Sequence, residues 1–280
     1  MSLVLIAGTA AAADRDGAWA VLDKSLSDGN ADRRQEALAA LSTLAGPNEG
    51  AVKRAEAALK DKDPLIRQSA ALTLGELGAK DAIPALQAAL DDTPEVAFAA
   101  AKALTAVGGP GGRDVLVAVL AGERKDAPGM MTNAMRKARD KLHHPEGLFL
   151  MGAQDATGAM FGPVSMVIPA IRDASDLKGK GAPGRAAAAA WLAKDPDPYA
   201  ITLLEWALND ENQLVRVEAA KALGTRGNAE SIASLEPLLT NSHNFVRDMA
   251  AASIIRVLDR NGEAGPVSAA PITPSAVAKH

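Results

Sequence analysis

The chain has 280 residues, no Cys, a formal net charge of −4 and only 3% aromatic residues. The lack of Cys excludes disulfides, thiolate nucleophiles and thiolate metal sites. The mildly acidic balance argues against a general nucleic-acid partner, because binding to phosphate backbones depends on clustered Lys and Arg. A sequence rich in Ala and Leu, with Gly and Pro at intervals, is typical of packed helices joined by short turns.

Residues 1–13, MSLVLIAGTAAAA, resemble the end of a secretory signal peptide with a cleavage site after Ala13. The basic segment that normally opens such a signal is missing, so this is either a truncated signal, with the start codon assigned too far downstream, or an apolar N-terminal arm. The pattern favours a periplasmic or secreted protein, with a cytoplasmic location as the alternative. No other stretch approaches the roughly 18 apolar residues of a membrane-spanning helix, so no transmembrane segment is predicted.

Three later segments of the sequence align without gaps and share an Arg at their fifth position. They are DPLIRQSAALTLGELG from Asp63, NQLVRVEAAKALGTRG from Asn212 and HNFVRDMAAASIIRVL from His243. In each segment small residues lie three and four places after the Arg, and Leu or Ile lies seven places after it. These positions share one face of a helix. Leu pairs eight and twelve residues before Arg216 and Arg247 indicate a preceding helix, so each unit is predicted to be two helices and a turn.

The same register extends to further units with origins at Arg34, Ala97 and Arg185. Outside the middle of the chain, neighbouring origins lie 30 to 33 residues apart, a period typical of stacked repeats. The sequence therefore predicts an all-α solenoid of about six or seven antiparallel helix pairs. The predicted divisions are repeats in 14–142 and 163–260, an irregular insertion in 143–162 and a disordered tail in 261–280.

Two further segments, Ile83-Pro84-Ala85-Leu86 and Ile168-Pro169-Ala170-Ile171, look like first helices of the same repeat. Together with the D-P-x-[IV]-R-x-x-A-A-x-x-L-G pattern of the second helices, they resemble the HEAT-repeat family. The resemblance is to the bacterial HEAT-like repeats of phycobilisome lyases, and it covers about residues 15 to 260. It implies that turn Asp and second-helix Arg residues hydrogen-bond between neighbouring repeats. It implies little about activity, because scaffolds, adaptors, enzyme subunits and lyases share these packing positions.

The insertion, HHPEGLFLMGAQDATGAMFG, is apolar and rich in Gly, without a helical period. One interpretation is an irregular connection that completes the core of the solenoid. The other is a partner-binding loop, since insertions in repeat arrays often lie on the binding face and Met and Phe adapt to many partners. Its candidate contacts are Phe149, Met151, Met160 and Phe161.

Gly179, Gly181 and Gly184 match the dinucleotide-binding fingerprint by letter. That fingerprint requires a strand before it, whereas helices are predicted on both sides here, so a nucleotide site is not predicted. A weaker hypothesis is an anion site at a helix N-terminus. Its residues would be Lys178, Lys180 and Arg185.

No catalytic, metal or cofactor site is predicted. His143 and His144 form the only His cluster, next to Pro145 in a turn, and the His-Glu dipeptides of HEAT-like di-iron hydroxylases are absent. The sequence thus favours a non-catalytic, monomeric scaffold or adaptor that binds a protein partner on a concave helical surface. The alternative is a subunit of an enzyme acting on a protein substrate, as in bilin lyases, where the reacting Cys belongs to the substrate.

The repeat register also predicts which residues line the concave surface. Positions one and five places after each origin are expected to face away from the buried stripe. They are Gln35, Gln68, Val217 and Asp248, and Ala39, Leu72, Lys221 and Ala252. Among these, Gln68, Leu72 and Lys221 are the candidate partner contacts.

Overall fold

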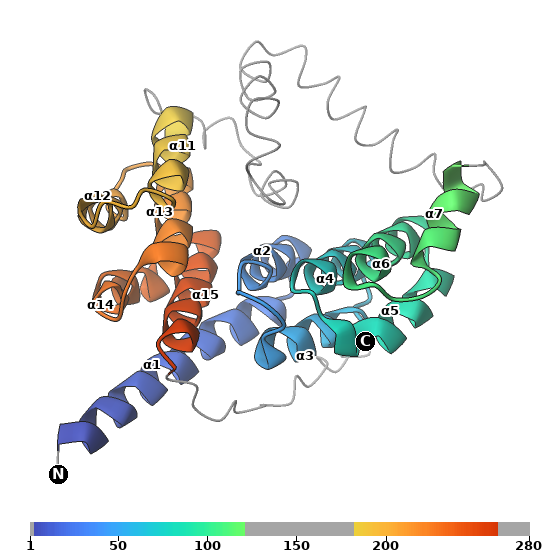
Figure 1. The fold of residues 1–280 in the computed structure, drawn as a ribbon, viewed down its shortest axis with the longest axis horizontal. Helices are drawn as coiled ribbons and strands as arrows, with labels where there is room; N and C mark the ends of the chain where they lie inside the picture. The colour runs from blue at the N-terminus through green and yellow to red at the C-terminus, as the bar shows by residue number, and fades with distance from the viewer. Residues whose placement is uncertain (1–2, 121–181, 263–280) are drawn as a thin grey trace, which may run out of the picture. The chain divides into compact units, whose positions relative to one another are not determined.

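The computed structural model describes residues 3–120 and 182–262, and these ranges are helical, with no strand (Figure 1). The α-helices are α1 (Leu3–Leu26), α2 (Ala31–Leu41), α3 (Glu49–Ala58), α4 (Pro64–Glu76), α5 (Ile83–Ala88), α6 (Pro94–Val107), α7 (Gly112–Leu120), α11 (Ala182–Leu192), α12 (Tyr199–Ala207), α13 (Gln213–Arg226), α14 (Ser231–Leu235) and α15 (Asn244–Arg260). Short 3-10 helices, η1 (Lys80–Ala82), η2 (Ala89–Asp91) and η4 (Glu236–Thr240), flank α5 and follow α14. The predicted all-α solenoid fold is confirmed.

The second helix of a repeat begins at a capping residue four places before the repeat origin. Side chains of Asn30, Asp63 and Asn212 each accept a hydrogen bond from the backbone N–H two residues later, at 2.8, 2.9 and 2.9 Å. Such caps satisfy N–H groups that have no partner within the helix. The turn between the two helices is therefore encoded locally.

The predicted apolar stripe of the second helices is buried. In α2, α4, α6, α13 and α15 the residues three, four and seven places after the origin have no exposed surface. Helix α11 differs, because Ala189 is only 3% exposed while Ala188 is exposed and Leu192 is half-buried. Burial of these Ala and Leu faces holds short helices that would be marginal alone in water.

Arg residues at the repeat origins brace the turn within their own repeat. The Nη1 atoms of Arg34, Arg67 and Arg216 donate to the carbonyl oxygens six residues earlier, at 2.7, 2.8 and 2.6 Å. Arg247 makes the same bond to Asn241. The conserved spacing within the chain thus has a local structural cause.

Two Arg at repeat origins, Arg67 and Arg185, link neighbouring repeats, as the family resemblance implied. Arg67 makes a bidentate ion pair with Asp92 at 2.6 and 2.7 Å, and Arg185 makes one with Asp210 at 2.7 and 2.9 Å. Each guanidinium holds the pKa of its carboxyl partner below the usual value, chiefly through these hydrogen bonds. Asp63 instead caps α4.

The chain divides into two compact units, one of residues 1–54 with 170–280 and the other of residues 55–169. In the second unit, α6 packs against α4 and α7. In the first unit, α11 packs on α13, α13 on α15, and α15 on both α1 and α2 (Figure 1). The last repeat therefore stacks against the first, an order that the sequence period does not predict.

The described helices reach only two of the predicted boundaries between segments of the chain. The cleavage site predicted after Ala13 lies inside α1, and α15 ends at Arg260, where the sequence loses its repeat period. The insertion at 143–162 lies outside the described residues, so its boundaries stay a prediction. No helix in residues 3–120 or 182–262 has the length and apolar character needed to span a membrane.

Candidate functional site

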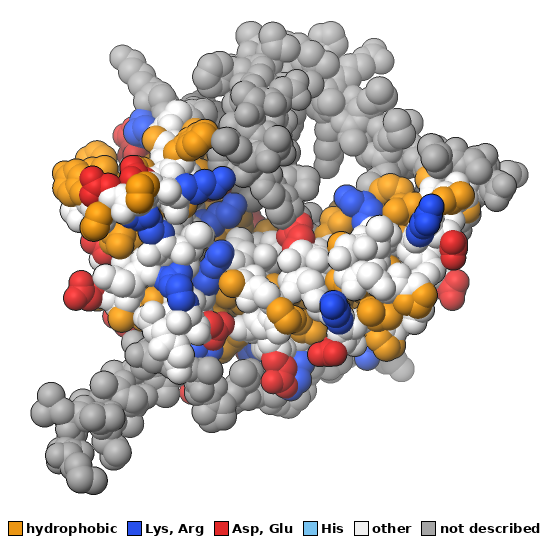
Figure 2. Space-filling model, viewed as in Figure 1, with side chains coloured by type: hydrophobic (Ala, Val, Ile, Leu, Met, Phe, Trp, Pro, Cys, Tyr) orange, Lys and Arg blue, Asp and Glu red, His pale blue; other side chains and the backbone are white. Residues whose placement is uncertain are grey.

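Large aromatic side chains are exposed on both α11 and α12. Three aromatic residues, Trp191, Tyr199 and Trp206, are 51%, 62% and 75% exposed, and we call them the α11–α12 aromatic surface. In the described part of the chain, Leu65 and Val117 are the other large hydrophobic residues with such exposure. Figure 2 shows hydrophobic side chains gathered over α12 with acidic side chains beside them. Exposed apolar patches of this kind often mark a contact with another protein.

The amphipathic pattern of α12 explains why its aromatic residues face outward. Ala200, Leu204 and Leu208 are at most 3% exposed, and their four-residue spacing places them on one buried face. Tyr199 and Trp206 lie seven residues apart on the opposite side, so they also share a face. Neither aromatic side chain belongs to the buried core of the repeat.

The start of α12 is fixed by polar contacts that orient this surface. The Asp197 carboxylate accepts a hydrogen bond from the Tyr199 backbone N–H at 2.9 Å. Arg226, at the end of α13, donates to the Asp197 carbonyl oxygen at 2.5 Å. Tyr199 and Trp206 therefore stand on a helix that is anchored, just before its first residue, to the end of α13.

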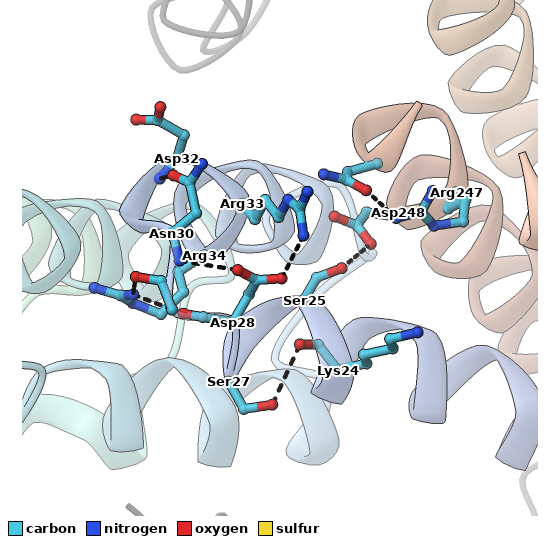
Figure 3. Close-up of polar contacts among 12 residues, drawn as sticks. Lys24, Ser25, Ser27, Asp28, Asn30, Asp32, Arg33, Arg34, Arg247 and Asp248 are labelled. Atoms are coloured by element: carbon cyan, nitrogen blue, oxygen red, sulfur yellow. Dashed lines mark hydrogen bonds and ion pairs between the residues drawn. The ribbon is translucent and has the colours of Figure 1, made fainter. Parts of the chain in front are cut away.

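A second polar cluster lies where the last repeat meets the first (Figure 3). Asp248 on α15 has no exposed surface, and the Ser25 hydroxyl on α1 donates to its Oδ1 at 2.6 Å. Within the described residues, Asp248 Oδ2 has no hydrogen-bond partner. A buried carboxyl with one unsatisfied oxygen is costly in its charged form.

The electrostatic surroundings of Asp248 favour its protonated form. Burial raises the pKa of Asp248 to about 7, the hydrogen bond from Ser25 opposes this, and the negative charge of Glu36 adds to it. Arg247 lowers this pKa and Asp28 raises it, both more weakly. Because no part of Asp248 reaches solvent, it can hold a proton but cannot contact a substrate.

Further polar contacts tie the same two repeats together. Asp259 on α15 accepts hydrogen bonds from Arg15 and Asn48, each at 2.6 Å. Arg256 donates to the Thr43 carbonyl oxygen at 2.7 Å. We call these contacts, with Ser25 and Asp248, the closure junction. They join the first and the last repeat of the chain.

The prediction of which residues line a concave surface is partly wrong. Val217, Asp248, Ala39 and Ala252 are at most 5% exposed, because a second helix in the stack is covered by neighbours on both sides. The candidate contacts Gln68, Leu72 and Lys221, and also Gln35, are half-buried. Their role in binding stays a prediction.

Other predicted site residues lie outside the described ranges. These are Phe149, Met151, Met160 and Phe161 of the insertion, and Lys178 and Lys180 of the anion site. The third anion-site residue, Arg185, is engaged by Asp210. In the ranges that the structure describes, no three His, Cys, Asp or Glu side chains are placed to bind a metal ion.

Sequence reasoning missed both the aromatic surface and the closure junction. A signal for the first was present, since Tyr199 and Trp206 alternate with the buried Leu204 and Leu208 at helical spacing. The second had no local signal, because Ser25 and Asp248 are 223 residues apart in sequence.

Comparison with known proteins identifies the repeat but not an activity. No curated protein sequence matches the chain. A solved structure of human deoxyhypusine hydroxylase in complex with glycerol is 22% identical, with 89% of this chain and 98% of that chain covered and a TM-score of 0.32. The family model for HEAT repeats matches residues 19–96, 52–127 and 179–255, which together make up more than half of the chain. The chain belongs to the HEAT-repeat family.

Proposed function

We propose that this chain is a non-catalytic scaffold that binds a protein partner, with the α11–α12 aromatic surface as its main contact. The observation that carries the proposal is the exposure of Trp191, Tyr199 and Trp206 on adjacent helices. Trp and Tyr dominate the binding energy of many interfaces, because they bury a large rigid area at a low cost in conformational entropy. HEAT repeats are suited to this role, since a stack of helices presents an extended surface.

Other residues complete the proposed contact. Gln68, Leu72 and Lys221 stay candidates on the second helices, and the Phe and Met residues of the insertion stay candidates for a binding loop. Removal of the insertion residues 147–161 tests that loop separately. If partner binding survives that removal, the loop is a connection and not a contact.

Affinity capture from extracts of cells that produce the protein naturally tests the aromatic surface. The variant Tyr199→Ser with Trp206→Ser is expected to lose the partner that the wild type captures. The matched control is Leu65→Ser with Val117→Ser, which removes two side chains that are 57% and 53% exposed elsewhere. All three proteins should keep the same helical circular dichroism.

The outcome of this comparison is decisive for the surface. A partner lost only in the aromatic variant supports the proposal, and purified partner should then bind the wild type with a measurable Kd. Equal capture by all three proteins would exclude the α11–α12 aromatic surface as the contact.

The alternative function is that of an enzyme subunit acting on a protein substrate, as in bilin lyases. It would use the same kind of contact surface. The identity of the captured partner separates the two proposals. A partner with a Cys-linked tetrapyrrole, formed only when this chain is present, would favour the lyase alternative over a scaffold.

We also propose that the chain is exported and acts as a monomer. A pattern ending in Ala13 supports export. Intact mass of the protein recovered from a periplasmic fraction tests this, because cleavage after Ala13 gives a defined N-terminus at Asp14. Recovery of the uncut chain from the cytoplasm would overturn it, and sedimentation of the purified chain tests the monomer.

A further inference from the structure

The closure junction occupies one face of α15. Asp248 and Asp259, which bond to side chains of α1, are eleven residues apart, or about three helical turns. Ala252 and Ile255 lie between them, at steps of four and three residues along the helix, and have no exposed surface. The last repeat therefore meets the first along most of α15, with Asp248 at one end of the contact.

The two repeats that meet at the junction each have other contacts. On one side, α15 also packs against α13, α14 and η4, and on the other side, α1 packs against α2. The facing residues Ser25 and Asp248 are 223 residues apart, so most of the chain lies between them. Separation of α15 from α1 and α2 would therefore leave each repeat with its own internal packing.

Asp248 is poorly satisfied in the closed junction when it is charged. The Ser25 hydroxyl donates to its Oδ1 at 2.6 Å, whereas its Oδ2 has no hydrogen-bond partner among the described residues. The whole residue is buried, so water does not solvate the second oxygen. A carboxylate in this position is costly. Protonation removes that cost while the junction stays closed, and exposure to solvent removes it when the junction opens.

Charges from the first repeat add to the effect of burial on Asp248. Burial raises the pKa of Asp248 to about 7, the hydrogen bond from the α1 hydroxyl opposes this, and the carboxylates of Glu36 on α2 and Asp28 before α2 add to it. Asp28 is itself paired with Arg33 at 2.7 Å (Figure 3). Arg247 on α15 lowers this pKa. In the described part of the chain, α13, α14 and η4 also pack on α15 but add no charge to the shift.

We propose that Asp248 controls the closure junction: the last repeat stays docked on the first while Asp248 carries a proton, and detaches from it when Asp248 is ionised. Detachment returns the carboxylate to water and separates it from Glu36 and Asp28. The Arg and Asn side chains of the junction keep their charge state between about pH 5 and 9, so they do not titrate with it.

The direction of the effect follows from the linkage of proton binding to docking. The docked state binds the proton of Asp248 more tightly than the detached state, so low pH favours docking. This contribution is lost as pH rises to about 7. The control lies in the joined first and last repeats and requires no partner, so it is separate from the α11–α12 aromatic surface and from the scaffold function proposed for it.

Because the chain has no Cys, a single buried thiol can report on detachment. Ala252→Cys places a thiol in the junction, and Ala250→Cys places one on the nearly opposite side of the same helix, at a residue that is equally buried. The rate of reaction with dithiodipyridine is measured on the purified chain at pH 5.5 and pH 8.5, on either side of the pKa of Asp248. Each rate is divided by that of a short peptide with the same local sequence, which corrects for ionisation of the thiol itself.

The relative reactivity of the Ala252→Cys thiol is expected to rise by about thirtyfold from pH 5.5 to pH 8.5, since docking raises the pKa of Asp248 from 3.8 to about 7. The Ala250→Cys thiol should stay equally protected at both pH values. Asp248→Asn, added to Ala252→Cys, should abolish the pH dependence, because an amide has no proton to lose in this range. Ile255→Cys repeats the test at a second junction position if Ala252→Cys does not fold.

Three results would overturn the proposal. Equal gains in reactivity for Ala252→Cys and Ala250→Cys would mean that the whole repeat unfolds as pH rises and does not simply detach. A pH dependence that survives Asp248→Asn would assign the control to another group. Unchanged reactivity of the Ala252→Cys thiol would mean that the junction is equally closed at both pH values.

Discussion

The interfaces between repeats that follow one another in sequence are stabilised differently from the closure junction. Between α4 and α6, a Cβ atom at Gly75 would lie 2.9 Å from the Cα of Ala103, and between α13 and α15, one at Gly224 would lie 2.9 Å from the Cα of Ser253. These helices are held by close backbone approach. Sequential repeats also share partly exposed ion pairs such as Arg67 with Asp92. The closure junction uses polar pairs with a more buried member, such as Ser25 with Asp248 and Arg15 with Asp259, whose residues are far apart in sequence.

The difference shows two ways of stabilising one fold. Sequential contacts depend on small residues that recur with the repeat, so every such pair of helices can pack in the same way. The closure junction joins repeats whose facing residues do not recur, and it is specified by polar side chains with defined partners. Substitutions at the two kinds of interface should therefore have different consequences.

The largest effect is expected from Asp259→Ala in the closure junction. The Arg15 side chain is 4% exposed, so loss of its carboxylate partner leaves a buried charge, and Asn48 loses its acceptor as well. We expect the free energy of unfolding to fall by about 2 to 4 kcal/mol in urea denaturation. Amide hydrogen exchange should rise in α1 and α15 and stay unchanged in α4 and α6.

The control for this prediction is Arg33→Ala, which removes an ion pair with Asp28 on the surface. The Arg33 side chain is 47% exposed, so solvent already screens the pair and stability should hardly change. Equal losses in the two variants would mean that burial of the Arg15 pair is not what stabilises the junction.

The next effect is a dependence of stability on pH that comes from Asp248. Burial raises the pKa of Asp248 to about 7 in the folded chain, above its value when unfolded, so the folded state binds this proton more tightly. Its contribution is complete below about pH 4 and is lost as pH rises to about 7. The free energy of unfolding of the wild type, relative to Asp248→Asn, should therefore fall by about 2 to 4 kcal/mol from pH 4 to pH 8.

A neighbouring carboxylate sharpens this test. Glu36→Gln removes a negative charge that raises the pKa of Asp248, so the loss of stability should move to lower pH. Parallel pH profiles for the wild type and Asp248→Asn would show that Asp248 does not control the closure junction.

A smaller effect on stability is expected at the interfaces between repeats that follow one another in sequence. Gly75→Ala and Gly224→Ala each force a Cβ atom against a neighbouring backbone, and should lower the free energy of unfolding by about 1 to 3 kcal/mol. Gly17→Ala is the control, because no atom lies within 4 Å of a Cβ at that exposed helix position. There Ala should raise stability by about 0.5 to 1 kcal/mol. Stabilisation by all three changes would contradict close backbone approach.

Whether a contact can be predicted from the sequence depends on how far apart its residues lie along the chain. The buried stripe of α13, with Ala219, Ala220 and Leu223, and the Arg216 brace of its turn are local, and the repeat register predicts them. Asp248 has the register of a surface position. It is buried because the last repeat stacks on the first, and a period of 30 to 33 residues carries no information about that contact.

The aromatic surface is an intermediate case. Its exposure follows from the amphipathic pattern of α12, which is local, and Tyr199 and Trp206 were predictable from the buried Leu204 and Leu208. The exposure of Trp191 was not. In the predicted register it lies beside the stripe, on a helix whose stripe is only partly buried.

The smallest effect is expected where a feature of the repeat pattern links two repeats, at Arg67 and Asp92. Their side chains are 17% and 22% exposed, so Arg67→Ala should cost about 1 kcal/mol, part of it from the lost brace to the Asp61 carbonyl. The hydrogen bonds from Arg67 lower the pKa of Asp92, so this contribution is present above about pH 4 and is lost as pH falls through the folded-state pKa. Urea denaturation at pH 7 and pH 3 should show a difference between wild type and Arg67→Ala that shrinks in acid. Arg113→Ala on α7 of the same unit is the charge-matched control. An equal loss of stability in that variant would mean that Arg67 contributes only through its charge and not through its contacts.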